Sequence, residues 1–400
     1  MNCGCTKRVA SGSRTILLMR EERCYGIANA KVSDENVNLG DWKRLELTSE
    51  SILNEIGTLT SAALNPERAV RRRKPGTHNP GGDISYELAN NGYGWLITQA
   101  IGKQLGAGTT GDPYTIIPVD CAGVPSDETA GYQQNSALYV DSEITYKAEC
   151  SDCAGYESGY YEVQPYSLEP GFSILLSRDG GTIKDENDED PTYHLWFQYL
   201  GSKVQTWTLS APATEWATGA FTIIARQEED LDMAIPTYRE RPTNVDPLSG
   251  FDGTVTIDTD TDLCVLSFDM TVNNNIGPDQ FCMGSRYRSS GPEGQRTIEG
   301  TIAIEFTNLV YYTKFKNGDS VAVQVLFDLF GDGTETMKLI LPNVEFNGET
   351  PQASGQEAIN QNLPYQALWD DSASSYLTVP AYAPRGFDIA VEIVTAGALV

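Results

Sequence analysis

The chain has 400 residues, a length that fits two domains, each able to bury a core of its own. Its 28 basic and 55 acidic residues give a net charge of −27, which repels nucleic acid and anionic membranes and argues against a DNA-binding protein. No run of 18 apolar residues occurs, and residues 1–10 lack the apolar core of a signal peptide. We therefore expect a soluble protein, made in the cytoplasm, that contacts no membrane.

The sequence suggests five segments. An N-terminal arm at 1–40, with one apolar run at 16–19, precedes a first module at 41–228. That module carries an insertion at 103–170, rich in Gly, Thr, Asp and Tyr, which indicates a surface elaboration. A proline-containing linker at 229–250 leads to a second module at 251–383 and then to a C-terminal tail at 384–400, whose apolar end needs a partner or frays.

A strand expected at 82–88 has a near copy at 300–306. In both, a glycine starts a run in which every second residue is apolar, while Glu87 and Glu305 hold the same place on the opposite face. This period of two indicates a half-buried strand. A short segment with helical spacing follows each copy and ends at glycine, 93–101 before Gly102 and 309–316 before Gly318.

Further matches extend the repeat. Segment 52–57 matches 272–277 at an offset of 220, and the strand pair above lies at an offset of 218. Segment 201–206 matches 341–346 at an offset of 140. The offset falls to 140 because the second half lacks the insertion. Segment 172–176 corresponds to segment 321–327, and the closing strand 216–225 corresponds to 363–369. We expect a mainly β protein with an internal duplication of strand, basic loop, strand, short helix, strand, hairpin, strand and strand.

The loop between the first two strands of each half is basic. An isolated basic run is typical of a solvated loop or a nucleic-acid patch. In so acidic a chain, and at the same place in both halves, we prefer contact with an acidic surface of a like subunit. The predicted contact residues are Arg68, Arg71, Arg72, Arg73, Lys74, Arg286, Arg288 and Arg296.

Eight cysteines are too sparse for a disulfide scaffold, so we expect mostly reduced thiols. Cys150 and Cys153 have the spacing of two zinc ligands, and Cys3 and Cys5 could add two more, although a C-x-C pair is not the usual spacing. The alternative, a cysteine-containing surface loop, is preferred. We expect no metal and no cofactor.

Candidates for catalysis are few. The two histidines, His78 and His194, lie in a basic loop and beside an acidic turn, so we expect no catalytic residues and no enzyme. Segment 258–269 resembles an EF-hand calcium loop, but Leu263 stands where that loop needs glycine, and the lead-in to a hairpin is preferred.

Several of these segments together resemble the major tail tube proteins of long-tailed bacteriophages, in a form with two fused tube modules. The resemblance spans about residues 16 to 380 and rests on the order and spacing of its motifs. The insertion and the cysteine-bearing ends depart from the family pattern. The motifs are residues 22–26, 47–51, 82–88, 201–209, 272–276, 300–306, 341–346 and 363–369.

The resemblance implies β-sandwich modules, each with a short flanking helix, whose inner sheets join those of neighbours into a continuous β-barrel ring. Rings stack into a tube in the virion tail, which is assembled in the host cytoplasm and conducts the genome during ejection. Two modules in one chain suggest a homotrimer with pseudo-sixfold symmetry, and a homohexamer is the alternative. Glu87 and Glu305 would face the lumen, and the basic loops would contact the next ring.

By the same resemblance, the partners are the chain itself and the tail terminator, tape measure and baseplate proteins. Phage DNA would pass through without specific binding. A competing hypothesis is a carbohydrate-binding or adhesive β-sandwich protein of a virion or cell surface, which would bind glycans through Tyr156, Tyr160 and Tyr161.

Overall fold

The structure is a computed structural model. It describes residues 15–22, 25–26, 42–62, 72–89, 92–105, 114–118, 171–178, 193–234, 236, 238–239, 246–277, 280–289, 291–331, 333, 336–348, 350, 359–377 and 386–394. Statements on structure concern these residues.

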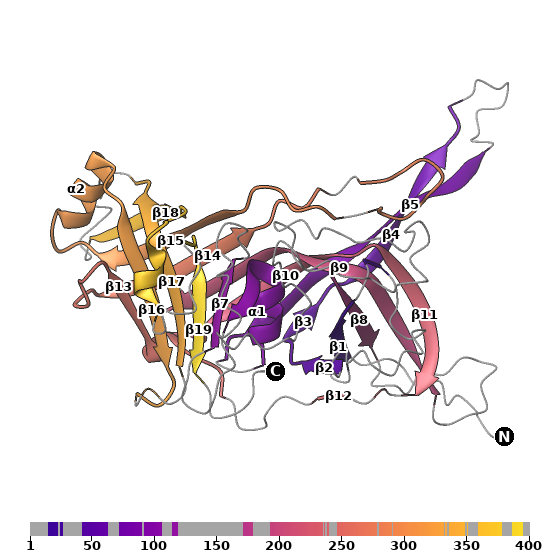
Figure 1. The fold of residues 1–400 in the computed structure, drawn as a ribbon, viewed down its shortest axis with the longest axis horizontal. Coiled ribbons are helices and arrows are strands. Elements are labelled where there is room, and N and C mark those ends of the chain that lie inside the picture. Colours follow the sequence, from indigo (N-terminus) through magenta and orange to yellow (C-terminus); the bar gives the residue numbers. More distant parts are fainter. Residues whose placement is uncertain are drawn as a thin grey trace, which may run out of the picture.

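The described chain is mainly β, as predicted, with two α-helices and two short 3-10 helices (Figure 1). The helices are α1 (Gly94–Ile101), α2 (Val310–Asn317), η4 (Gly250–Asp252) and η5 (Ala373–Tyr376). The strands are β1 (Ile16–Glu21), β2 (Trp42–Leu45), β3 (Ser49–Glu50), β4 (Leu53–Thr60), β5 (Arg73–Glu87), β6 (Gly102–Leu105), β7 (Tyr114–Pro118), β8 (Phe172–Ser177), β9 (Tyr193–Pro212), β10 (Thr218–Ile224), β11 (Gln227–Ala234), β12 (Tyr238–Arg239), β13 (Gly253–Ile257), β14 (Val265–Asn273), β15 (Thr297–Glu305), β16 (Val321–Asp328), β17 (Thr336–Phe346), β18 (Asn360–Ala367) and β19 (Ala390–Val394).

Strand β9 organises the sheet because it is long enough to serve two sets of neighbours. Its first part pairs with β8 and β11, and its second part pairs with β10 and β14. All pairings in the described sheet are antiparallel except that of β12 with β2. Through β9, the strands of the two expected halves form one connected sheet, in the order β4, β5, β10, β9, β14, β15, β18, β17.

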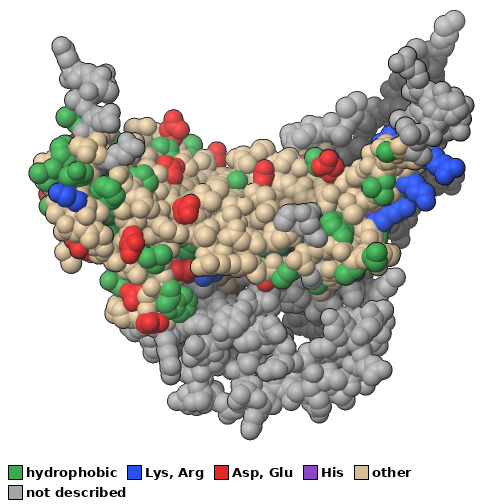
Figure 2. Space-filling view, turned by 90° about the horizontal axis from the view of Figure 1, so that it is seen from above, with side chains coloured by type: hydrophobic (Ala, Val, Ile, Leu, Met, Phe, Trp, Pro, Cys, Tyr) green, Lys and Arg blue, Asp and Glu red, His purple; other side chains and the backbone are tan. Residues whose placement is uncertain are grey.

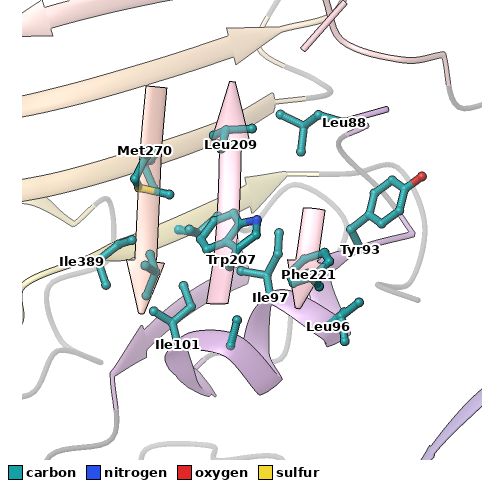
Figure 3. Close-up of a cluster of buried hydrophobic side chains, with 14 of the residues drawn as sticks. Leu88, Tyr93, Leu96, Ile97, Ile101, Trp207, Leu209, Phe221, Met270 and Ile389 are labelled. Atoms are coloured by element: carbon teal, nitrogen blue, oxygen red, sulfur yellow. The ribbon is translucent and has the colours of Figure 1, made fainter. Parts of the chain in front are cut away.

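The apolar face predicted for the repeated strand is confirmed. Ile84 and Tyr86 of β5 and Leu88 directly after it are buried, and so are Ile302 and Ile304 of β15. Helix α1 lies against this face, and its side chains meet strands from both halves in one hydrophobic core (Figure 3).

One side-chain hydrogen bond is buried inside this core. Trp207 Nε1 of β9 donates a 2.7 Å hydrogen bond to the Tyr86 hydroxyl of β5, and both side chains are almost fully buried. The contact joins two strands that are not adjacent in the sheet, because the Tyr86 side chain passes over Gly219 of β10, and the Phe221 ring stacks against both rings.

Both predicted helices are confirmed, and each ends at the predicted glycine. Gly318 after α2 adopts the left-handed conformation, and its N–H caps the last turn by donating to Lys314 and Phe315 carbonyls. Helix α1 is apolar almost all round and buried, whereas α2 buries mainly Tyr311. The two helices therefore differ in how deeply they enter the core.

Three segments differ from the prediction. The expected linker begins as β11, which pairs with the first part of β9, so residues 229–234 belong to the sheet. The expected C-terminal tail contains β19, which pairs with β17 and with β7 at the start of the expected insertion. The apolar run of the N-terminal arm is β1, held between β2 and β8. Each of these segments forms a strand because it pairs with a strand that is distant in the sequence: β11 with β9, β19 with β17, and β1 with β8.

Candidate functional site: a polar sheet face and a basic arm

The side of the sheet away from α1 carries the residues that alternate with the buried ones, and we call it the polar face. Its side chains align in rows across the strands: Ser85, Ala220, Thr208, Thr271, Glu299 and Gln366 are successive partners. All are half-buried or exposed. The polar face consists of Asp83, Ser85, Glu87, Thr206, Thr208, Ser210, Thr218, Ala220, Thr222, Asp269, Thr271, Asn273, Glu299, Thr301, Ala303, Glu305, Asn360, Asn362, Pro364 and Gln366.

The polar face holds carboxylates among small polar groups and contains no lysine or arginine at these positions. Two carboxylates are tied to hydroxyls of the neighbouring strand: Thr222 Oγ1 donates to Asp83 at 2.7 Å, and Ser210 Oγ donates to Asp269 at 2.6 Å. These bonds hold the side chains against the sheet. Such a surface repels an anion without offering it a cation to bind.

Glu87 and Glu305 both lie on the polar face, at the C-terminal ends of β5 and β15. Seen from this side, acidic and apolar side chains are scattered over a surface of uncharged polar groups and backbone, while most of the visible Lys and Arg side chains gather on an outlying hairpin at one end (Figure 2). The structure thus brings the two predicted glutamates onto one continuous surface and separates them from the basic cluster.

The outlying hairpin is formed by β4 and the first part of β5 and projects from the body (Figure 1); we call it the basic arm. Arg72, Arg73 and Lys74 are exposed near its end, where Thr60 pairs with Arg73 and Leu59 with Lys74. Arg68 and Arg71, also predicted as contact residues, lie outside the described residues.

The basic arm also exposes apolar side chains. Leu53, Ile56 and Leu59 of β4 are 54%, 46% and 66% exposed. Apolar side chains that cluster on a projecting element, beside charged groups, are typical of protein contact sites. The arm therefore offers both charge and apolar area to a partner.

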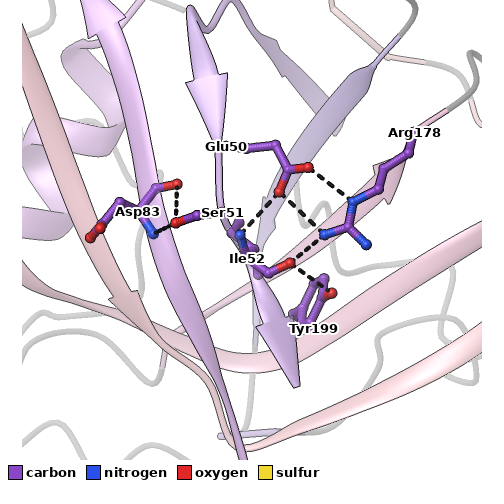
Figure 4. Close-up of polar contacts among 6 residues, drawn as sticks. All are labelled: Glu50, Ser51, Ile52, Asp83, Arg178 and Tyr199. Atoms are coloured by element: carbon purple, nitrogen blue, oxygen red, sulfur yellow. Dashed lines mark hydrogen bonds and ion pairs between the residues drawn. The ribbon is translucent and has the colours of Figure 1, made fainter. Parts of the chain in front are cut away.

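A polar network fixes the base of the arm, where the chain bends between β3 and β4 (Figure 4). Glu50 accepts hydrogen bonds from Arg178 Nε at 2.9 Å and from the Ile52 N–H at 3.0 Å. Arg178 also donates to the Ile52 carbonyl. The Ser51 N–H donates to the Asp83 carbonyl, and Ser51 Oγ accepts from the Asp83 N–H, both at 2.9 Å. These contacts set the direction in which the arm leaves the sheet.

Gly82 is required at this bend. Its φ is +153°, and a Cβ there would lie 2.4 Å from the Ser51 carbonyl oxygen and 2.7 Å from the Ile52 Cα. Backbone atoms cannot move aside as a flexible side chain can. The glycine that begins the repeated strand thus allows β5 to pass close to the bend.

The second basic segment lies beside the arm. The His78 N–H of β5 donates to the Arg286 carbonyl at 3.0 Å, and the His78 and Tyr287 rings are 5.0 Å apart. Arg286 is exposed. Four of the predicted cations therefore lie along the basic arm or directly beside it: Arg72, Arg73, Lys74 and Arg286.

The other two predicted contact residues are engaged within the chain. Arg288 is 3% exposed and donates to the Ala225 carbonyl at 2.7 Å. Arg296 forms a two-pronged ion pair with Asp388 and donates to the Ile101 carbonyl at 2.8 Å. These guanidinium groups hold the segment between β14 and β15 against the body.

A buried carboxylate, which no local sequence pattern predicts, lies where β1, β8 and β9 meet. Glu22 is 4% exposed and accepts hydrogen bonds from the Gly26 N–H at 2.7 Å, Ser173 Oγ at 2.7 Å and the Gly201 N–H at 2.8 Å. Burial raises the pKa of Glu22 to about 7, although these bonds and nearby Arg226 oppose the rise.

The remaining candidates give no site in the described residues. Cys150 and Cys153, and with them Tyr156, Tyr160 and Tyr161, lie outside those residues, and no group of three His, Cys, Asp or Glu side chains suited to a metal was found among the rest. In the EF-hand-like segment, Asp258 pairs with Lys314 and Asp260 accepts from the Tyr311 hydroxyl, so both carboxylates hold α2.

Neither α-helix in the described part of the chain has the length and apolar character needed to cross a membrane. A search of curated proteins found no match. The family model described as phage tail tube protein matches residues 12–367, which is most of the chain. Members of this family are structural components of the virion tail. The chain belongs to the phage tail tube protein family.

Proposed function

We propose that this chain polymerises as stacked rings into the tail tube and that its polar face lines the conduit through which the phage genome passes into the host cell. The observation that carries the proposal is the continuous polar face, which crosses from the first half to the second through the β9–β14 pairing. A wall of hydroxyls and carboxylates without cations repels phosphates and does not hold them. Glu87 and Glu305 are proposed to face the lumen.

The ring is proposed to close by strand pairing between copies. Among the described strands, β4 pairs with β5 alone and so presents an open edge. Strand order repeats along the sheet, β4, β5, β10, β9 and then β14, β15, β18, β17. The pairing of β9 with β14 inside the chain thus serves as the pattern for a pairing between copies: the last residues of β17, Glu345 and Phe346, lie beyond its pairing with β16 and would begin the contact with β4 of the next copy, which removes the open edge.

The register supports the internal duplication on which this pattern rests. Ser49 pairs with Ser85, and Ser267 pairs with Ala303, so both partners are displaced by 218 positions. The same displacement relates the pairs that Glu50, Leu53, Asn54 and Glu55 make with β5 to pairs of β14 with β15, and the pairs of β4 from Ile56 onward, in the arm, have no counterpart there. A constant 218 fits the pairing better than the 220 suggested by sequence matching, because it reproduces the partner pairs; the two offsets differ by two residues and so keep the same faces.

Size agrees with passage of a duplex. Eight strands per chain in a homotrimer give 24 strands, and at a spacing of about 4.8 Å and a tilt of about 40° they close a barrel about 48 Å across. Side chains narrow the hole to about 40 Å, which admits B-DNA with surrounding water. A homotrimer with pseudo-sixfold symmetry, each half a β-sandwich module, is the proposed ring, and a homohexamer is the alternative.

The basic arm is proposed to contact the next ring. Arg72, Arg73, Lys74 and Arg286 are exposed and carry this role, with Arg68 and Arg71 added from the sequence. Because Arg288 and Arg296 are bound inside the chain, we assign them to holding the segment in place. We propose assembly in the host cytoplasm, together with terminator, tape measure and baseplate proteins, and no catalytic role.

Reversing the charge of the arm tests the proposal. In the variant Arg72→Glu/Arg73→Glu/Lys74→Glu we expect soluble, folded subunits that no longer form tubes, because the arm would then repel an acidic partner. Negative-stain microscopy gives the readout, with wild-type tubes as reference. Lys316→Glu, an exposed charge reversal on α2, is the control for a general effect of added negative charge. Normal tubes from the arm variant would contradict the assignment of the arm.

A further inference from the structure

At the end of the sheet opposite the basic arm, two aromatic side chains are exposed among acidic residues. Trp216 in the β9–β10 turn is 51% exposed, and Phe251 in η4 is 78% exposed. Glu215 and Asp246 beside them are exposed. We call these four residues the acidic end patch. Residues 211–219 and 246–254, which carry the patch, contain no lysine or arginine.

The patch has a firm base. Trp216 and Ser249 form a β-bridge, and the Gly250 N–H donates to the Glu215 carbonyl at 3.0 Å. Leu248 is fully buried, and its N–H donates to the Leu88 carbonyl at 2.7 Å. Ser249 and Asp252 cap η4 reciprocally. Hydrogen-bonded backbone therefore holds the two aromatic rings in exposed positions. Exposed aromatic surface held in this way is costly in water unless a partner covers the rings.

Register places the patch and the arm at opposite ends. Along β5, Gly81 next to the arm pairs with Ile224, and Glu87 at the other end pairs with Thr218, directly after the turn that holds Trp216. The 15 residues of β5 span about 50 Å. Copies stacked head to tail therefore bring the arm of one against the patch of the next.

The two surfaces are complementary. The arm presents Arg72, Arg73 and Lys74 beside the exposed Leu59, and the patch presents two free carboxylates beside Trp216 and Phe251. We propose that the acidic end patch is the receptor for the basic arm of a second copy of this chain. This proposal rests on the proposed stacking of rings and adds the surface that receives the arm. The aromatic rings bury against the apolar side of the arm, and the carboxylates pair with its cations.

Weakening the patch should separate ring formation from stacking. For Trp216→Ser/Phe251→Ser we expect folded protein and intact rings, but a critical concentration for tube formation raised at least about tenfold, as for loss of central aromatic contacts. The matched control is Leu309→Ser, which removes an apolar side chain that is 61% exposed at the start of α2; this helix contacts Asp258 through Lys314, at the end of β13 remote from η4. Sedimentation gives the critical concentration, and microscopy distinguishes rings from tubes.

Charge exchange and cross-linking identify the partner surfaces. Glu215→Lys/Asp246→Lys should abolish tubes, and combining it with the arm reversal should restore them at least in part. Carbodiimide treatment of wild-type tubes should link Lys74 to Glu215 or Asp246, and dissociated rings should lack this link. If wild-type tubes form while patch variants stack normally and the link is absent, the receptor assignment is wrong and the tube proposal stands. If wild-type protein forms neither rings nor tubes, the tube proposal itself fails.

Discussion

Replacing Glu22 by glutamine should remove a measurable part of the pH dependence of folding. The carboxyl group is buried where the strands β1, β8 and β9 meet, and burial raises its pKa to about 7 from an ordinary value of 4.5. Between these two pH values, the folded chain holds a proton that the unfolded chain has lost. The contribution of Glu22 to the free energy of unfolding is therefore fully present below about pH 4.5, and it is lost as the pH rises through 7.

The size of the effect follows from the pKa difference. At about 1.4 kcal/mol for each pH unit, the rise from 4.5 to about 7 corresponds to about 3 kcal/mol, and the side chain is too well buried for solvent to reduce it much. Glutamine is neutral at every pH and resembles the protonated carboxyl in shape. The stability of the wild type relative to Glu22→Gln should therefore fall by about 3 kcal/mol between about pH 4.5 and pH 8.

Urea unfolding of unassembled subunits, followed by circular dichroism at several pH values, measures this difference directly. Taking the difference between the two proteins cancels the contribution of the many other carboxylates in this acidic chain. A difference that stays flat, or a wild type that gains stability relative to the variant as the pH rises, would refute the reasoning. A flat difference would mean that the three hydrogen bonds offset burial at Glu22, and a gain would mean that they outweigh it.

Three further substitutions test the geometry of the sheet. Gly82→Ala should cost about 3 kcal/mol or more, because its Cβ meets the Ser51 carbonyl oxygen, whereas Gly318→Ala, with open space around it, should cost about 1 kcal/mol in the same denaturation assay. Equal costs would argue against the close approach at Gly82. Tyr86→Phe should cost about 1–3 kcal/mol by leaving the buried Trp207 N–H without its acceptor, and an unchanged midpoint would contradict that contact.

The elements that could be predicted from the sequence are those with a strong local signal. Alternation in 82–88 and 300–306 predicted which side chains of β5 and β15 are buried, and the terminal glycines predicted where α1 and α2 end. The alternation also placed Glu87 and Glu305 together on the opposite face. Local periodicity suffices there because each strand has one buried face.

The rest depends on partners that are distant in the sequence. Strand β11 has an acidic sequence without clear alternation, and the long β9 supplies the edge that makes it a strand. Likewise, Arg288 and Arg296 belong to a basic run, and their burial depends on the Ala225 and Ile101 carbonyls and on Asp388. No local sequence pattern predicts such contacts. No local pattern predicts the burial of Glu22 either.

A reconstruction of purified tubes by cryo-electron microscopy tests the central claim most directly. The account predicts rings of three chains, a continuous wall of 24 strands, and the polar face with Glu87 and Glu305 toward the lumen. A wall in which α1 faces the lumen and the polar face points outward would contradict it.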